Sequence, residues 1–391
     1  MDNISLLCKT IYIEIIYLVL VNMQPENETF LNRFDRKAYD IIAKGWNKGT
    51  VTKEECTYLL GFDPLSLEMS YARMAANDLV RKCTGNTGSI VAQVGLMLNP
   101  CPADCKFCNF AASQSKMEPF IMSDDEFTEK IKEITMYGDV TAMCLMTMHN
   151  FDIDEMKHKI KLARKLVPKE FNMSLNAGDM DYETCIELKA AGANKAYHVC
   201  RLREGTDTRL DPKARIQTMK NMISAGIPVC THTEPVGPEH SDKELADNFF
   251  LGIEAGCDSF GVMRRIATPG TPLAHRGQIS EARVTQLSAV FSLVLSGRTE
   301  RPIVNIHEPC QLGLFSGATV ITAEYGGNPR DVERETEKNR GFLVQECRKM
   351  LYDAGFEYIQ KVDGSKAKLN IDYLKRTKTC MCDDGVITRI V

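Results

Sequence analysis

The sequence predicts an α/β protein built as a (β/α)8 TIM-type barrel, complete or partial, with an N-terminal helical cap and a C-terminal extension. From residue 88 onward, short apolar runs alternate with amphipathic helical stretches. A small residue followed by glycine recurs where each expected helix ends, and Gly192, Gly226 and Gly256 among these glycines stand roughly 30 residues apart, the length of one βα unit. A doubly wound open sheet is the alternative, and in both folds the chemistry belongs at the carboxyl ends of the strands.

Composition narrows the class of protein. The chain has 391 residues with a net charge of −4, 26 % charged and 44 % apolar, which is typical of soluble globular proteins. Wholesale disorder and a polytopic membrane protein are excluded, and no basic surface for nucleic acid is indicated. We therefore expect neither a nucleic-acid nor a membrane partner. Fifteen cysteines, an odd number, favour a reduced cytoplasmic protein with some metal-binding thiolates over a secreted one.

The first element, residues 1–22, is mostly apolar but contains Lys9 and Glu14. A carboxylate near the centre of a bilayer is costly, and no small-residue cleavage site of a signal peptide follows. We expect Met23 to be the natural start and residues 1–22 to be a non-native or disordered extension; an amphipathic helix on the body is the alternative. Residues 23–86 form the predicted helical cap, with helices over 33–44, 52–60 and 65–82.

The barrel is predicted over residues 87–364. Its first strand runs over 90–98, and a capping box at Ser123-Asp-Asp-Glu126 opens the next helix. Further strands are expected over 140–146, 171–175 and 195–199, with helices over 153–166 and 182–190. The repeated small-residue–glycine pairs end at Gly192, Gly226, Gly256, Gly317 and Gly355. Residues 365–391, with Cys380 and Cys382, do not continue the repeat and form the predicted extension.

The strongest motif is Cys101-Pro-Ala-Asp-Cys105-Lys-Phe-Cys108, which follows the first strand at the expected mouth of the barrel. Thiolates suit iron–sulfur clusters and zinc. Structural zinc commonly takes four ligands in two separated pairs, whereas this loop offers three cysteines. Three thiolates on a four-iron cluster leave one iron open to an exogenous molecule, which is a catalytic arrangement. The alternative is a non-catalytic barrel with a zinc loop completed by a remote residue.

This loop, with the aromatic Phe107 before the last cysteine, resembles the radical S-adenosylmethionine (SAM) superfamily. The closest resemblance is to the biotin synthase-like branch, over about residues 95–355, through Ala142-Met-Cys144-Leu-Met, Ala225-Gly-Ile-Pro-Val-Cys230 and Gly270-Thr-Pro-Leu273. The resemblance implies a [4Fe-4S] cluster on Cys101, Cys105 and Cys108, with SAM on the fourth iron. It further implies one-electron cleavage of SAM to a 5′-deoxyadenosyl radical, which abstracts hydrogen from a small substrate or a carrier-bound group.

The resemblance also implies residues that contact SAM. Arg215 occupies the place of an arginine for the SAM carboxylate, and Glu204 that of an acidic residue for its amino group, with Phe107 beside the cofactor. The alternative for both charged residues is a solvated helix end. A reductant such as ferredoxin or flavodoxin is the expected protein partner, and a homodimer is an open prediction.

Biotin synthases hold a second cluster inside the barrel on three cysteines and one arginine. Cys144 and Cys230 match two of these positions, whereas Met173 and Asn305 stand at the other two. Cys310 is the candidate to complete an auxiliary cluster, and Cys380 with Cys382 is a second candidate anchor. An auxiliary cluster would predict sulfur insertion, and its absence would predict carbon-skeleton rearrangement or metallocofactor maturation. The alternative is that Cys144 and Cys230 are small buried hydrophobes.

Other polar residues fall at expected strand ends. His198, His232 and Glu234 are candidates either for substrate contact or for satisfied polar groups at the mouth. Arg264 and Arg265 suggest an anionic substrate, with a surface charge pair as the alternative. The sequence names no substrate.

Overall fold

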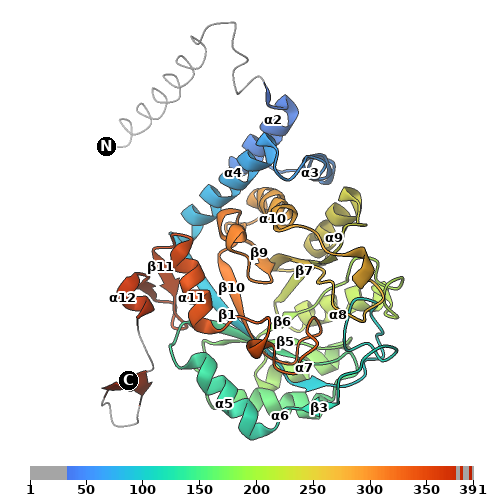
Figure 1. Ribbon diagram of the computed structural model, residues 1–391, viewed down its shortest axis with the longest axis vertical. Coiled ribbons are helices and arrows are strands. Elements are labelled where there is room, and N and C mark those ends of the chain that lie inside the picture. The colour runs from blue at the N-terminus through green and yellow to red at the C-terminus, as the bar shows by residue number, and fades with distance from the viewer. Residues whose placement is uncertain (1–32, 376–378, 382–386, 390–391) are drawn as a thin grey trace, which may run out of the picture.

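The computed structural model describes residues 33–375 and two short strands at 379–381 and 387–389. The predicted extension over 1–22, the start at Met23 and the side chains of Cys380 and Cys382 lie outside the described part. Eight parallel strands curl around a common axis (Figure 1). They are β1 (Thr87–Gly95), β4 (Val140–Met146), β5 (Asn172–Asn176), β6 (Lys195–Tyr197), β7 (Val229–Val236), β8 (Ser259–Arg264), β9 (Val304–His307) and β10 (Val320–Gly326).

The strand order confirms the predicted barrel and excludes the doubly wound sheet. Ladders run β10-β1-β4-β5-β6-β7-β8-β9, and among the described residues none joins β9 to β10. The Asn305 side chain spans this seam, because its Oδ1 accepts from the backbone N–H groups of Thr319 at 3.4 Å and Val320 at 3.2 Å. A side chain thus replaces the missing ladder between β9 and β10.

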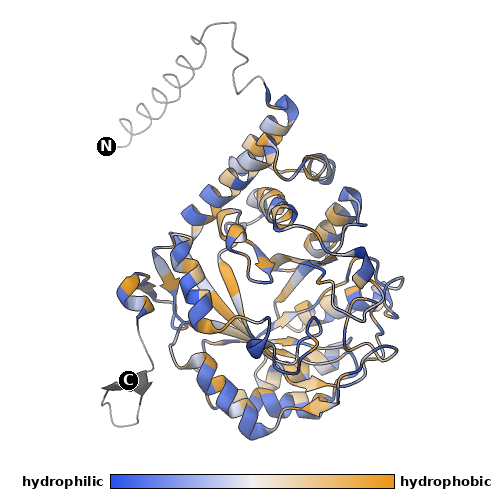
Figure 2. Ribbon diagram, in the orientation of Figure 1, coloured by the Kyte–Doolittle hydropathy of each residue, from blue (hydrophilic) through white to orange (hydrophobic). Residues whose placement is uncertain are grey.

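Helices follow the strands and cover the outside of the barrel, and hydrophobic and hydrophilic residues alternate along them (Figure 2). They are α5 (Asp124–Thr135), α6 (Ile153–Arg164), α7 (Tyr182–Ala191), α8 (Pro212–Ser224), α9 (Asp242–Ala255), α10 (Glu281–Ser296) and α11 (Val344–Asp353). The predicted capping box of Ser123 and Glu126 opens α5. All five predicted glycines have positive φ, the conformation that ends a helix at least cost. Gly317 follows the short 3-10 helix η3 (Gln311–Phe315), so there the expected α-helix is absent.

The first predicted strand, 90–98, is broken in the structure. β1 ends at Gly95, where the backbone touches that of Gly327: an added Cβ would lie 1.8 Å from the Gly327 carbonyl oxygen. Met97 and Leu98 form the separate strand β2 (Met97–Leu98), which pairs antiparallel with β3 (Phe120–Ile121). The cysteine loop is therefore carried by a small hairpin above the barrel rather than by the barrel strand itself.

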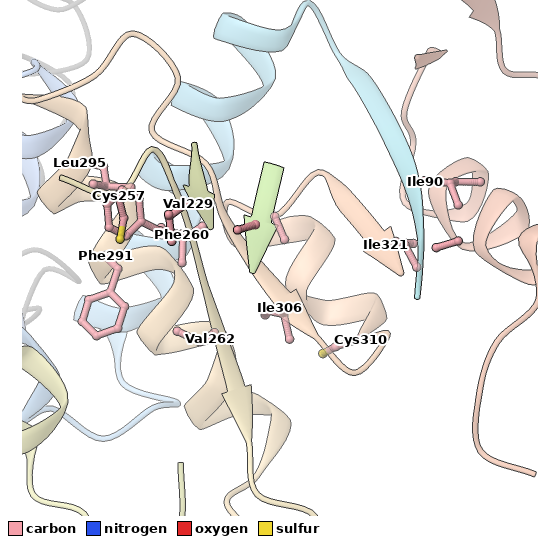
Figure 3. Packing of buried hydrophobic residues seen from close by; sticks show 14 of the residues in the cluster. Ile90, Val229, Cys257, Phe260, Val262, Phe291, Leu295, Ile306, Cys310 and Ile321 are labelled. Atoms are coloured by element: carbon pink, nitrogen blue, oxygen red, sulfur yellow. The ribbon is translucent and has the colours of Figure 1, made fainter. Parts of the chain in front are cut away.

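The N-terminal cap consists of α2 (Arg36–Trp46), α3 (Lys53–Leu60) and α4 (Leu67–Thr84). It lies against α10 (Figure 1), where the Ser296 hydroxyl donates to the carbonyl oxygen of Gly45 at 2.6 Å. Every residue from Val284 to Ser296 is buried, because α10 lies between the cap and the barrel. On its barrel side, Phe291 stacks on Phe249 with ring centroids 3.9 Å apart, beside Phe260 and Val262 of β8 (Figure 3).

The chain after α11 closes the other end of the barrel. β11 (Tyr358–Gln360) pairs parallel with the start of β1 and antiparallel with β12 (Lys366–Lys368), and α12 (Ile371–Leu374) follows. Of the helices described, none has the length and apolar character needed to cross a lipid bilayer.

Candidate active site

The three cysteines of the loop face one small cavity at the mouth of the barrel. Its volume is about 100 Å³, and Cys101, Cys105 and Cys108 all line it. The loop is closed on itself, because Cys101 N–H donates to the Phe110 carbonyl at 2.8 Å and Cys108 N–H donates to the Cys105 carbonyl at 3.0 Å. The backbone N–H of Phe110 also donates to the Cys108 sulfur at 3.3 Å. The fold therefore gathers three thiols and already hydrogen-bonds one of them.

The donor set fits an iron–sulfur cluster better than a single ion. Within the described residues, no three His, Cys, Asp or Glu side chains converge closely enough to hold one metal ion. Burial raises the pKa of the Cys105 thiol to about 11 and also raises that of Cys108. Bound metal reverses this effect, since it coordinates the thiolate form. Three thiols spaced around a cavity suit a centre larger than one ion, such as a [4Fe-4S] cluster.

Arg215 and Glu204, both expected to contact SAM, lie together behind the cysteines. Arg215 is buried in the first turn of α8, lines the cysteine cavity and donates to the Val199 carbonyl at 3.0 Å and to Asp179 Oδ1 at 2.8 Å. Its Nη2 makes no hydrogen bond to a described residue. Glu204 lies 3.8 Å from Arg215 Nε and accepts from the Thr208 hydroxyl at 2.6 Å. Arg215 thus has a donor left for a ligand, whereas Glu204 is already engaged.

Arg201 is a cavity residue that sequence reasoning missed. It follows β6, lines the cysteine cavity, and its Nε lies 3.4 Å from Glu234 Oε1. Its position between Glu234 and Glu204, 3.9 Å from the latter, raises its pKa despite burial. The signal in the sequence was its position directly before Leu-Arg-Glu204 at a strand end. Asp179, which pairs with Arg215, was missed as well.

Two further cavities continue from the cysteines into the barrel. One, of about 110 Å³, is lined by Cys105, Phe107, Cys108 and Arg201. The other, of about 610 Å³, occupies the barrel interior. Their linings share three polar residues, namely Gln93, Tyr197 and His307. A path of polar residues therefore runs from the cysteine loop to the barrel interior.

The auxiliary-cluster residues are only partly brought together. Cys144 and Cys230 line the interior cavity, whereas Cys310 is buried outside its lining. The inward position on the third strand is Ser174, which pairs with Cys144 in register, and Met173 is buried in the core instead. Assigning Met173 to the interior was wrong, because neighbouring residues of a strand point to opposite faces.

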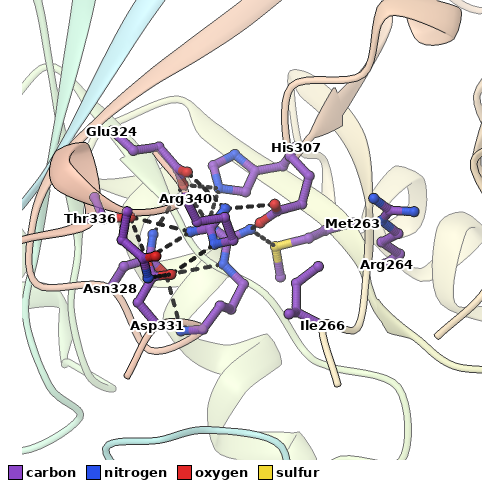
Figure 4. Close-up of polar contacts among 12 residues, drawn as sticks. Met263, Arg264, Ile266, His307, Glu324, Asn328, Asp331, Thr336 and Arg340 are labelled. Carbon is purple, nitrogen blue, oxygen red and sulfur yellow. Dashed lines mark hydrogen bonds and ion pairs between the residues drawn. The ribbon is translucent and has the colours of Figure 1, made fainter. Parts of the chain in front are cut away.

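A buried ionic network closes the mouth on the side of β9 and β10. Figure 4 shows Glu324, His307 and Arg340 converging there. Arg330 donates to His307 Nε2 at 2.8 Å and to Glu324 at 2.5 Å, and it also pairs with Glu308. Burial and the neighbouring Arg340 lower the pKa of Arg330 to about 9. His307 Nε2 therefore lies against both the Arg330 guanidinium and, at 3.3 Å, Glu324 Oε1.

The remaining candidate residues at strand ends differ in how far other protein groups engage them. Arg264 and Arg265 both line the cavity of about 110 Å³. Arg264 lies 3.6 Å from Glu281, whereas Arg265 donates hydrogen bonds to Glu239 at 2.5 and 3.0 Å. His198 is fully buried beside Asp179. Arg265 and His198 are therefore held by the protein itself.

Comparison with known proteins fits this geometry. The Radical SAM superfamily model matches residues 97–251, from β2 into α9, a span that holds the three cysteines, Glu204 and Arg215. Residues 97–251 are a radical SAM domain. Such a domain implies a [4Fe-4S] cluster and SAM, for which the three thiols and Arg215 are suitable ligands.

The curated relatives of this chain include biotin synthases, which confirms the resemblance to that branch. That of Pelotomaculum thermopropionicum is 24 % identical over 254 residues, covering 63 % of this chain and 78 % of the relative. That of Aquifex aeolicus is 22 % identical over 326 residues, covering 78 % and 95 %.

Solved structures share the fold. Methylornithine synthase has a TM-score of 0.67 at 16 % identity, covering 81 % of this chain and 96 % of its own. The FeFe-hydrogenase maturase HydG from Carboxydothermus hydrogenoformans has a TM-score of 0.67 at 17 % identity, covering 82 % and 79 %. These likenesses establish the barrel fold and leave the reaction to be argued from the residues.

Replacing Arg215 by methionine is expected to weaken SAM binding about 10- to 100-fold, since a hydrogen bond to a charged group contributes about 1.5–3 kcal/mol. Isothermal titration of the cluster-loaded protein with SAM measures this. Lys213→Met is the matched control, because Lys213 is exposed on the same helix. Unchanged SAM affinity in Arg215→Met would remove Arg215 from the SAM site.

Proposed function

We propose that the chain is a radical SAM enzyme that abstracts hydrogen from a small molecule held inside the barrel. The observation that carries the proposal is the convergence of Cys101, Cys105, Cys108 and Arg215 on one cavity at the barrel mouth. When bound, a [4Fe-4S] cluster with SAM supplies a one-electron cleavage that yields the 5′-deoxyadenosyl radical. We also propose that the electron comes from a ferredoxin- or flavodoxin-type reductant.

The protein's part is to position the cofactor and exclude water. The loop sulfurs would hold the cluster and Arg215 Nη2 would bind the SAM carboxylate, whereas Glu204 lies behind Arg215, outside the cavity lining, and would act on the cofactor only through Arg215. Apolar side chains gather around the loop and shield it from solvent. They are Met97, Leu98, Phe110, Met148 and Leu210.

The barrel interior favours chemistry without a second cluster. Only two of the four ligand positions of a biotin synthase interior carry sulfur here, Cys144 and Cys230, while Ser174 and Asn305 offer neutral oxygen and amide groups. Rearrangement of a carbon skeleton or maturation of a metallocofactor is therefore the preferred reaction class. Sulfur insertion is the second candidate, favoured by Cys144 and Cys230 lining one cavity and by the biotin synthase relatives.

The test is to purify the protein without oxygen and to measure iron and acid-labile sulfide per chain. About four of each supports one cluster and the preferred class. Six to eight of each would make sulfur insertion the better proposal and direct mutagenesis to Cys144 and Cys230. A colourless protein that contains zinc and no sulfide would overturn the enzyme assignment in favour of a zinc-binding barrel.

A further inference from the structure

His232 lies inside the barrel without a hydrogen-bond partner. It belongs to β7, lines the interior cavity and is 8 % exposed. Its Nδ1 is fully buried and unpaired, and no described residue bonds its Nε2. Buried polar groups in native proteins are nearly always hydrogen-bonded, and leaving one unsatisfied costs about 1–3 kcal/mol. An unpaired imidazole on a cavity wall therefore requires an explanation.

The neighbouring strand is built to accommodate this ring. Gly261 of β8 stands opposite His232 in the ladder, and a Cβ added at Gly261 would lie 2.4 Å from His232 Nε2. On the other side the Tyr197 ring meets the imidazole edge-on, with centroids 4.8 Å apart. Tyr197 itself is fixed by a hydrogen bond to Glu234. The imidazole is thus held in place by shape, and Nε2 is the nitrogen left open to a ligand, because Nδ1 is fully buried.

The groups nearest to His232 are polar, and the nearest charge, Arg330 behind His307, is already paired with Glu308 and Glu324. The ring centroid of His307 lies 6.1 Å from that of His232. Gln93, Ser174 and Asn305 complete the polar wall. Burial lowers the pKa of both His232 and His307, so both rings are neutral at pH 7.

Charged side chains lining the interior cavity come from its far end, where the strands begin. Glu170 precedes β5, Lys195 is the first residue of β6, and Arg301 precedes β9. Asp258 likewise precedes β8, and Lys361 follows β11. No charged group among the described lining residues lies at the middle of the barrel beside His232. A carboxylate or ammonium group there would lose its hydration without gaining a counter-charge.

We propose that His232 hydrogen-bonds the substrate, and that the substrate presents an uncharged polar group, such as an amide, a hydroxyl or a ring N–H, to the middle of the barrel. The proposal rests on the proposed function and names the substrate class for it. The Nε2 atom of a neutral imidazole can either donate or accept one hydrogen bond, which matches such groups. The interior volume of about 610 Å³ is in the range of small-molecule sites. His232 is thus a specificity-determining residue.

The test uses three probes of equal chain length: butyramide, butyrate and butylammonium. Saturation-transfer NMR on the full chain measures their dissociation constants, and ¹⁵N-histidine spectra report on the His232 ring. We expect butyramide to bind at least tenfold more tightly than either ion and to shift the His232 ring signals. His232→Phe should weaken butyramide at least tenfold, and His232→Gln should restore part of the affinity.

Two further variants separate contact from folding. Gly261→Ala displaces the imidazole without removing it and should weaken butyramide as His232→Phe does. His275→Phe, at an exposed histidine, should change nothing. Tightest binding by butyrate or butylammonium, or equal butyramide affinity in His232→Phe and wild type, would overturn the proposal. Iron, sulfide and deoxyadenosine measured on the same samples report separately on the proposed function.

Discussion

Replacing Cys101, Cys105 and Cys108 together by alanine is expected to remove the bound iron and to abolish 5′-deoxyadenosine formation. The three sulfurs line one cavity, and no other set of three His, Cys, Asp or Glu side chains among the described residues could hold a metal ion in their place. A radical SAM active site without its cluster has no route for the electron to reach SAM. The rate of 5′-deoxyadenosine formation should therefore fall to the rate measured without enzyme, rather than to an intermediate value.

The measurement is chromatographic detection of deoxyadenosine after anaerobic reduction with dithionite, alongside iron and sulfide analysis. Cys83→Ala and Cys185→Ala are matched controls, because Cys83 is exposed and Cys185 is buried in α7, outside the three cavities. Both should keep iron and activity. Deoxyadenosine formation at the wild-type rate in the triple variant would show that the cluster lies elsewhere.

Much of the barrel was predictable because its signals are local. The strand over 140–146 has the predicted bounds, and the small-residue–glycine pairs mark positive-φ residues as expected. The failures depend on contacts distant in sequence. The contact of Gly95 with Gly327 breaks the first strand, and α10 is buried on all sides because the cap covers it. Neither contact leaves a periodic pattern in the sequence.

The residues of the candidate site show the same difference between local signals and contacts distant in sequence. The three cysteines were predictable because one loop carries them all. Arg201 and Asp179 become visible only when the strand ends meet around the cavity. The isolation of His232 is a property of the folded barrel, since it depends on the space opposite Gly261 and on the absence of bonding partners. Sequence reasoning could name His232 as a candidate but could not choose between its two roles.

The largest expected effect on stability comes from Asp139, which lies fully buried just before β4. Its carboxylate accepts from Arg348 Nε at 2.7 Å and from Lys361 Nζ at 2.7 Å, and the Tyr373 hydroxyl also donates to it. Arg348 is 2 % exposed, so it cannot regain its hydration in the folded state. Removing one partner of a buried ion pair typically costs about 3–5 kcal/mol.

We therefore expect Asp139→Ala to lower the urea midpoint of unfolding strongly, while Asp353→Ala, which breaks an exposed pair with Lys349, barely changes it. The urea midpoint of Asp139→Asn should lie between those of Asp139→Ala and Asp353→Ala, because the amide oxygen still accepts hydrogen bonds but carries no charge. Lys361 lines the barrel interior and connects the chain after β11 to Asp139 through its hydrogen bond. We therefore expect the lower stability of Asp139→Ala to appear first as faster proteolysis of residues 358–368. Equal midpoints for Asp139→Ala and Asp353→Ala would show that the C-terminal hairpin does not depend on this carboxylate. A lower midpoint with unchanged iron content would separate the closure of this end of the barrel from the cysteine site at the other.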